Sequence, residues 1–161
     1  MKKFIIGLLS LIVIMSLSAC GSSEPKVEMT ADSSLTNLEE KISNISNVKI
    51  FDESTDPNEN LGRPGQYIGK GDFFDSRIED SEENAGTIEF FSSKADCKDR
   101  YEYLCKMSDP ELGAFGVNQY IYKYELAIFR VSYDFTPTEA EEYKTAMDEI
   151  MGEVSIQYEG K

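Results

Sequence analysis

Apolar residues recur every three or four positions in three segments of the chain, a spacing that places them on one face of an α-helix. The first helix is expected to begin near Ser33 or Ser34, with its apolar face at positions 35, 38, 42 and 45. The second is predicted over residues 94–107, after the candidate N-cap Ser93 and before Asp109-Pro110.

The third segment has the most complete helix start. Thr136 can cap the helix, Pro137 fits its first position, and Glu139 lies where a capping box needs an acid. Its apolar stripe runs to a region near Gly152, and glycine commonly marks a helix terminus. A helix is therefore predicted from Pro137 to about Gly152.

Elsewhere the apolar period is two, which indicates β-strands. Residues 117–124 and 127–135 are predicted to form an antiparallel hairpin that turns near Glu125. Further strand candidates are residues 48–51, 67–78 and 86–91. The order α-β-β-β-α-β-β-α predicts an α+β fold, a two-layer sandwich in which helices pack on one face of a mainly antiparallel sheet.

The N-terminus has the organisation of an export signal. Lys2-Lys3 precedes an apolar run at residues 4–14, and Leu17-Ser18-Ala19-Cys20 follows. This order resembles the signal of bacterial lipoproteins, in which a diacylglyceryl group joins the lipobox cysteine and a peptidase cuts just before it. The resemblance implies a lipid on Cys20 and a place at the outer face of the cytoplasmic membrane, and Gly21 is compatible with a Gram-positive host.

Two other interpretations of this segment fit less well. A membrane-spanning helix needs about 20 apolar residues, whereas residues 4–19 number sixteen. An ordinary secretory signal would not need a cysteine directly after Ala19.

Three regions are therefore expected: a signal peptide at residues 1–19, a lipidated N-terminus with a flexible stalk at residues 20–34, and one globular domain at residues 35–161. The stalk is rich in Ser, Glu, Asp and Thr, so it cannot bury enough apolar surface to offset its ordering entropy.

The acidic composition limits the partners. Without residues 1–19 the chain has fourteen basic and thirty acidic residues, a net charge of −16. This charge argues against nucleic-acid binding, which needs clustered Lys and Arg, and against electrostatic adhesion to anionic lipids. Contact with the membrane is therefore expected through the lipid.

The chain contains no histidine, the commonest general base and the commonest metal ligand. No catalytic residue and no metal ligand is therefore assigned. A carboxylate-based site stays open as an alternative, although thirty acidic residues on a solvated surface produce close pairs by chance.

Residues 52–60, DESTDPNEN, place oxygen-bearing side chains at every second position, as calcium loops do. The EF-hand requires glycine at the sixth position and glutamate at the twelfth, and counting from Asp52 these are Pro57 and Arg63. A turn shaped by Asp, Pro and Asn is the favoured interpretation. Calcium is the alternative, and beyond the covalent lipid no other cofactor is expected.

The stretch from Leu61 to Tyr67 has two glycines and a proline and is expected to display Arg63. With Asp56-Pro57-Asn58 it resembles a segment of small uncharacterised lipoproteins of Gram-positive bacteria, and this resemblance implies no activity. Because arginine and tyrosine are frequent interface anchors, Asp56, Asn58, Arg63 and Tyr67 are candidate partner-binding residues. A structural connection is the favoured interpretation of this stretch, and partner binding is the alternative.

Tyr120, Tyr122 and Tyr124 share one face of the predicted hairpin. They would form an exposed aromatic platform for a partner if the opposite face packs on the helices. Packing of the aromatic residues in the core is the default interpretation, and the platform is the exception to it.

Cys97 and Cys105 are eight residues apart on the second predicted helix. They would be about 12 Å apart along it, beyond the roughly 7 Å between α-carbons that a disulfide spans. Both are expected to be buried free thiols.

These features predict a lipid-anchored extracytoplasmic lipoprotein that binds a protein or another envelope component without catalysis. An envelope enzyme with a carboxylate-based or cation-assisted site is one alternative. A structural or secretion-assisting lipoprotein with no small ligand is another.

Overall fold

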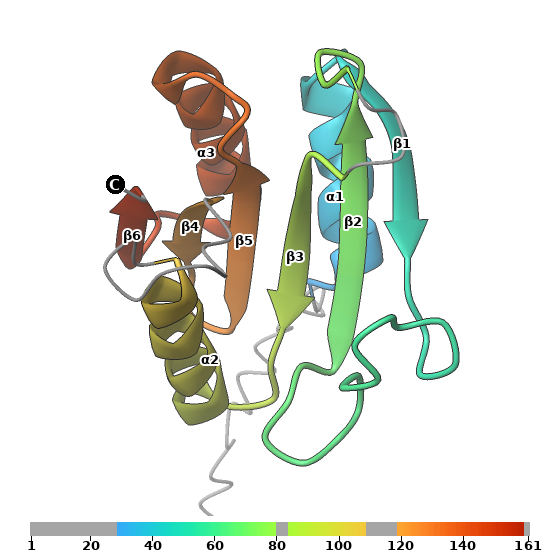
Figure 1. The fold of residues 1–161 in the computed structure, drawn as a ribbon, viewed down its shortest axis with the longest axis vertical. Helices are drawn as coiled ribbons and strands as arrows, with labels where there is room; N and C mark the ends of the chain where they lie inside the picture. The colour runs from blue at the N-terminus through green and yellow to red at the C-terminus, as the bar shows by residue number, and fades with distance from the viewer. Residues whose placement is uncertain (1–28, 80–83, 109–118, 160–161) are drawn as a thin grey trace, which may run out of the picture.

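A computed structural model describes residues 29–79, 84–108 and 119–159 (Figure 1). Its elements are α1 (Ala31–Lys41), β1 (Ile45–Ile50), β2 (Gly69–Asp75), β3 (Gly86–Phe90), α2 (Lys94–Met107), β4 (Gln119–Lys123), β5 (Ala127–Ser132), α3 (Pro137–Met151) and β6 (Ile156–Glu159). The predicted α+β class and element order are confirmed. The strand β6 follows α3 and was not predicted.

All neighbouring strands are antiparallel, in the order β1-β2-β3-β5-β4-β6. The strands β1, β2 and β3 form a meander, and β3 then pairs with β5, where Ile88 lies opposite Phe129. The predicted hairpin is confirmed as β4 and β5, and the Tyr124 N–H donates to the Ala127 carbonyl at 2.8 Å across its turn.

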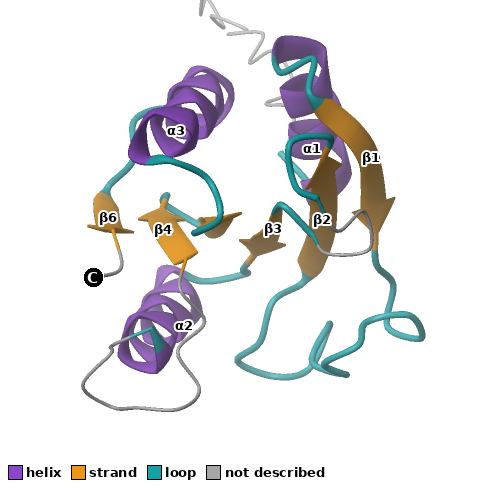
Figure 2. Cartoon of the chain, turned by 45° about the horizontal axis from the view of Figure 1, so that its top comes forward, coloured by secondary structure: helices purple, strands orange, loops and turns teal. Residues whose placement is uncertain are grey.

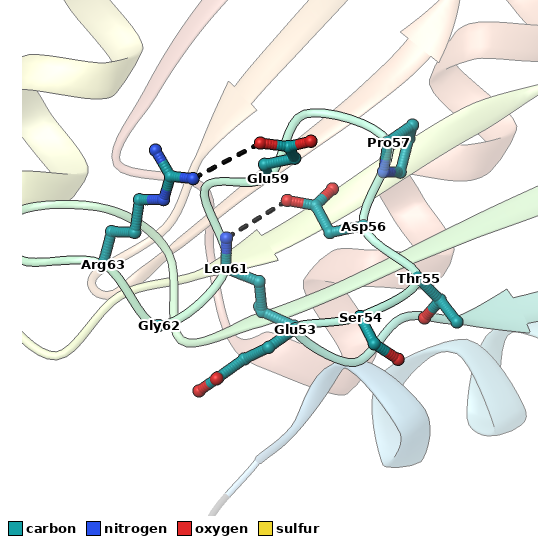
Figure 3. Close-up of a pocket in the computed structure, with 9 residues that line it drawn as sticks. All are labelled: Glu53, Ser54, Thr55, Asp56, Pro57, Glu59, Leu61, Gly62 and Arg63. Atoms are coloured by element: carbon teal, nitrogen blue, oxygen red, sulfur yellow. Dashed lines mark hydrogen bonds and ion pairs between the residues drawn. The ribbon is translucent and has the colours of Figure 1, made fainter.

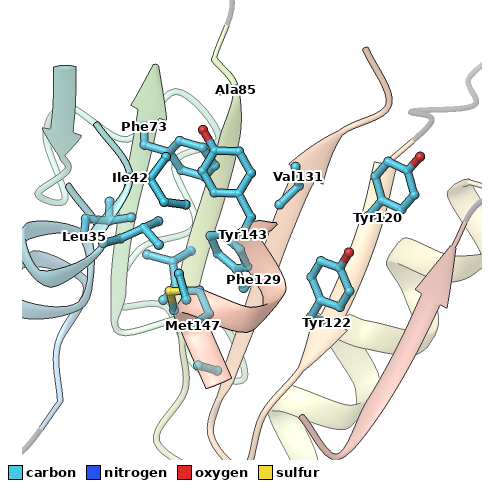
Figure 4. Packing of buried hydrophobic residues seen from close by; sticks show 14 of the residues in the cluster. Leu35, Ile42, Phe73, Ala85, Tyr120, Tyr122, Phe129, Val131, Tyr143 and Met147 are labelled. Atoms are coloured by element: carbon cyan, nitrogen blue, oxygen red, sulfur yellow. The ribbon is translucent and has the colours of Figure 1, made fainter. Parts of the chain in front are cut away.

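The helices lie on both faces of the sheet (Figure 2). The helices α1 and α3 cover one face over a large core that contains Leu35, Phe73, Phe129 and Met147 (Figure 4). The helix α2 lies on the opposite face, over a smaller core.

The helices were predicted to pack on one face of the sheet. This holds for α1 and α3 but not for α2, and the smaller core explains why. Cys97, Tyr101 and Leu104 of α2 pack there with Ile121 of β4 and Ile128 of β5. These two isoleucines alternate with the residues that face α3, so the hairpin has a second apolar face that α2 covers.

The helix ends follow local capping signals. The helix α2 has the predicted bounds and the Ser93 N-cap, and α3 begins with the predicted capping box of Thr136 and Glu139 and ends at the Gly152 cap. The helix α1 begins at Ala31, because Thr30 caps it, rather than near Ser33 or Ser34. Its first turn therefore overlaps the predicted stalk.

Gly86 lies where β3 passes close to two neighbours. A Cβ at this position would overlap the carbonyl oxygen of Arg130 and the ring of Phe73. At Gly69, by contrast, a Cβ would meet Phe90 and Ala31 at 3.6 and 3.9 Å, which is ordinary contact.

We expect Gly86→Ala to lower the free energy of unfolding by about 3 kcal/mol, since overpacking of this kind costs about 1–3 kcal/mol and here one neighbour is backbone. Gly69→Ala should change it by less than about 1 kcal/mol. Urea denaturation of both variants measures the difference, and equal stabilities would contradict the close packing at Gly86.

Candidate functional site

The loop between β1 and β2, residues 51–68, is organised around the carboxylate of Asp56. This side chain is fully buried and accepts hydrogen bonds from three backbone N–H groups in residues 58–61. The Tyr67 hydroxyl donates to it at 2.7 Å, and the Lys70 ammonium donates at 2.8 Å. The two candidates Asp56 and Tyr67 are therefore brought together, but inside the loop.

The electrostatics of this contact fix its charge state. Burial by itself would raise the pKa of Asp56, but hydrogen bonds from Lys70 and Tyr67 outweigh burial and hold the pKa well below its usual range. Burial and the bond to Asp56 raise the pKa of Tyr67. Asp56 is thus an ionised acceptor beside a neutral phenol, and this placement favours a structural role for both residues.

Local turns account for the calcium-like alternation. One carboxylate oxygen of Asp52 accepts the backbone N–H groups of Ser54 and Thr55, each at 2.9 Å, and both of their hydroxyls. Such side-chain bonds to nearby backbone define an Asx turn. Within the residues that the structure describes, no group of three or more Cys, Asp or Glu side chains could hold a metal ion.

Arg63 and Asn58 are the exposed members of the predicted set. Arg63 is 60% exposed at its side chain and lies 3.5 Å from the Glu59 carboxylate. It lines a polar hollow of about 560 Å³ within the loop, together with residues 53–57 (Figure 3). Gly62 has a positive φ of 77°, which L-residues rarely adopt, so the loop backbone itself shapes this hollow.

The tyrosine row, on β4 and the residue after it, lies in the core. Tyr120, Tyr122 and Tyr124 are all buried, and their hydroxyls donate to the Phe135 carbonyl, the Ala140 carbonyl and the Asp148 carboxylate. Figure 4 shows Tyr120 and Tyr122 among the core residues. The hypothesis of an exposed aromatic platform is therefore wrong, and the default interpretation, packing in the core, is confirmed. The hairpin face that carries these tyrosines packs under α3, and α2 covers the opposite face.

A buried cluster of charges lies beneath α2, and the sequence reasoning missed it. Glu89 of β3 is fully buried and binds Arg100 of α2 and Arg130 of β5, at 2.8 and 3.1 Å. Burial would raise the pKa of Glu89, but the two arginines hold it below its usual value. The sequence signal that could have revealed this cluster is an acidic residue at an inward-facing position of a buried strand. Because Glu89 is held by both arginines, it joins helix to sheet and is not poised as a general base.

The two cysteines described in α2 are free thiols, as predicted. Cys97 is fully buried, and burial raises the pKa of its thiol to about 11. Cys105 is half-buried.

A second hollow, of about 730 Å³, is lined by residues at or next to the beginnings of α1, β2 and β5 and the end of β3. Figure 1 shows that these element ends lie at one end of the sheet. We call this hollow the apolar groove. Five segments line it: Met29–Ala31, Ile68–Gly69, Phe90–Phe91, Tyr124–Leu126 and Met151. Ile68 and Leu126 are 59% and 38% exposed, and both lie at the same hollow. Exposed apolar side chains are informative where they gather at a groove, as these two do.

The polar groups of the groove lining are already engaged. The Tyr124 hydroxyl donates to Asp148, the Thr30 side chain caps α1, and Glu125 pairs with Lys94 at 2.5 Å. No lysine or arginine belongs to the described lining. A concave, largely apolar site of this volume is suited to an apolar ligand. The sequence could not indicate it, because its wall joins five segments that are far apart in the chain.

The chain matches no protein-family model, no curated protein and no solved structure. Among the helices of the described residues, none has the length and the hydropathy needed to cross a bilayer.

We expect Asp56→Asn to lower the free energy of unfolding by about 3–5 kcal/mol at neutral pH, because it leaves the buried Lys70 ammonium without its counter-ion. The folded state depresses the pKa of Asp56, so its contribution is complete above the usual aspartate value of 3.8 and is lost as the pH falls below it. The difference in free energy of unfolding between wild type and Asp56→Asn should therefore become smaller as the pH falls below 3.8. Urea denaturation across this pH range measures it.

The matched control is Glu59→Gln, which removes the exposed partner of Arg63 and should change stability by less than about 0.5 kcal/mol. If the stability difference between wild type and Asp56→Asn stays constant down to pH 2.5, Asp56 does not carry the expected charge.

Proposed function

We propose that the protein is a lipid-anchored binding module of the cell envelope, held at the outer face of the cytoplasmic membrane through Cys20. The Leu17-Ser18-Ala19-Cys20 pattern supports the anchor. Two acyl chains bury enough methylene groups for stable anchoring, whereas a single chain is marginal.

The observation that carries the binding function is the apolar groove. Its lining joins Met29, Phe90, Phe91 and Met151 with the exposed side chains of Ile68 and Leu126. Exposed apolar side chains that rim a hollow mark binding surfaces more often than isolated exposed residues do.

Binding is favoured over catalysis by the chemistry of the lining. Its carboxylate, that of Glu125, is paired with Lys94 and exposed to solvent. A general acid or base would need a poised pKa beside a bound substrate. The buried carboxylates of Asp56, Asp75 and Glu89 have lowered pKa values and are each bonded to a cationic side chain instead.

The anchor predicts a specific mass change. Intact-mass analysis of membranes that express the wild type should find a chain that begins at Cys20 and carries a diacylglyceryl group. Cys20→Ala should remain unprocessed and gain no lipid. A wild-type product without lipid would end this part of the proposal.

The groove predicts that the mature chain without its lipid takes up an apolar fluorescent probe with 1:1 stoichiometry. Gly69→Leu should weaken uptake at least five-fold, because a side chain at Gly69 points between Phe90 and Ala31. The control is Tyr133→Ser, which removes an exposed apolar residue from beyond the far end of β5. Titration of probe fluorescence measures uptake, thermal unfolding checks the fold, and equal uptake by all three proteins would contradict a binding role for the groove.

A further inference from the structure

The apolar groove lies at the end of the domain that the chain enters from Cys20. Met29, Thr30 and Ala31 form part of its wall. The nine peptide units between Cys20 and Met29 extend to about 30 Å at most. A lipid on Cys20 therefore keeps the groove within about 30 Å of the bilayer surface.

The exposed apolar residues belong to the same end. Ile68 directly precedes β2 and Leu126 directly precedes β5. Figure 1 shows both strands beginning at the end of the sheet where α1 begins. The chain entry, the hollow and the two exposed side chains thus coincide.

Charge limits how this end can meet a membrane. The chain after residue 19 has a net charge of −16, and Lys94, the cation that contacts the groove lining, is paired with Glu125. Burial of apolar surface, rather than attraction to anionic head groups, is therefore the driving force that this end can offer. A tether makes such a contact effective even when it is weak, because it raises the local concentration of lipid at the groove.

We propose that the apolar groove rests on the outer leaflet and takes an acyl chain of a membrane lipid, with Ile68 and Leu126 inserted beside it. This inference rests on the proposed anchor at Cys20. It identifies the ligand of the binding module as bilayer lipid rather than a second protein.

The test uses full-length protein in living cells, with a photoreactive phenylalanine analogue placed at Ile68, at Leu126 or at Tyr133. Tyr133 is the matched control, since it is 44% exposed and follows β5 at the opposite end of the sheet. After irradiation, mass spectrometry should find phospholipid adducts at positions 68 and 126 at least ten times as often as at position 133. Gly69→Leu should reduce the adduct at position 126 several-fold.

Equal lipid capture at the three positions would overturn the inference. Capture of a specific protein, or of a second copy of this chain, at positions 68 and 126 in place of lipid would overturn it as well. The comparison with position 133 decides the matter even if Gly69→Leu fails to fold. Mass spectrometry also measures the N-terminal peptide of each sample. A chain without lipid on Cys20 refutes the anchor. A lipidated chain without lipid adducts refutes the groove inference alone.

Discussion

One buried carboxylate, that of Asp56, holds the long connection between β1 and β2 against the sheet. It accepts bonds from the loop backbone and from Tyr67, and it pairs with Lys70, which already belongs to β2. Moving two charges out of water is costly, and the pair tolerates it because several hydrogen bonds satisfy the carboxylate at once. The loop therefore arrives at Ile68, on the rim of the groove, with a defined backbone path.

The groove itself follows from the way the helices cover the sheet. The helix α1 begins and α3 ends near the same end of the sheet, so Ala31 and Met151 both reach the groove wall. Neither helix extends beyond that end, and the turn at Glu125 and Leu126 closes only part of it. The hollow is thus a consequence of element lengths, and its apolar lining is the end of the large core left open.

The sequence was informative wherever structure depends on adjacent residues. The caps at Ser93 and Thr136 and the hairpin turn after Tyr124 involve groups three or four positions apart, so the residue types alone predict them. Alternation also identified two faces of the hairpin. It could not say which face α3 would cover, because Ile121 and Ile128 make the second face apolar as well.

The candidate site was less predictable, because its contacts join residues that are far apart in the chain. Asp56 was a candidate partner-binding residue, but it is buried in an ion pair with Lys70, fourteen positions away. The strand β6 is only four residues long and shows too little alternation to be recognised, yet pairing with β4 stabilises it. The groove depends on five segments whose proximity only the tertiary fold defines.

The outer strands of the described sheet have a further consequence, for the association of one copy of the chain with another. An outer strand presents unpaired backbone groups that can template aggregation between copies. Here β1 has an irregular register between Ile45 and Asn47 and carries the exposed cation Lys49, and β6 is short. Irregular register, an exposed lysine and short length each discourage strand pairing between molecules. The outer strands of the described sheet therefore disfavour edge-to-edge pairing between copies of the chain.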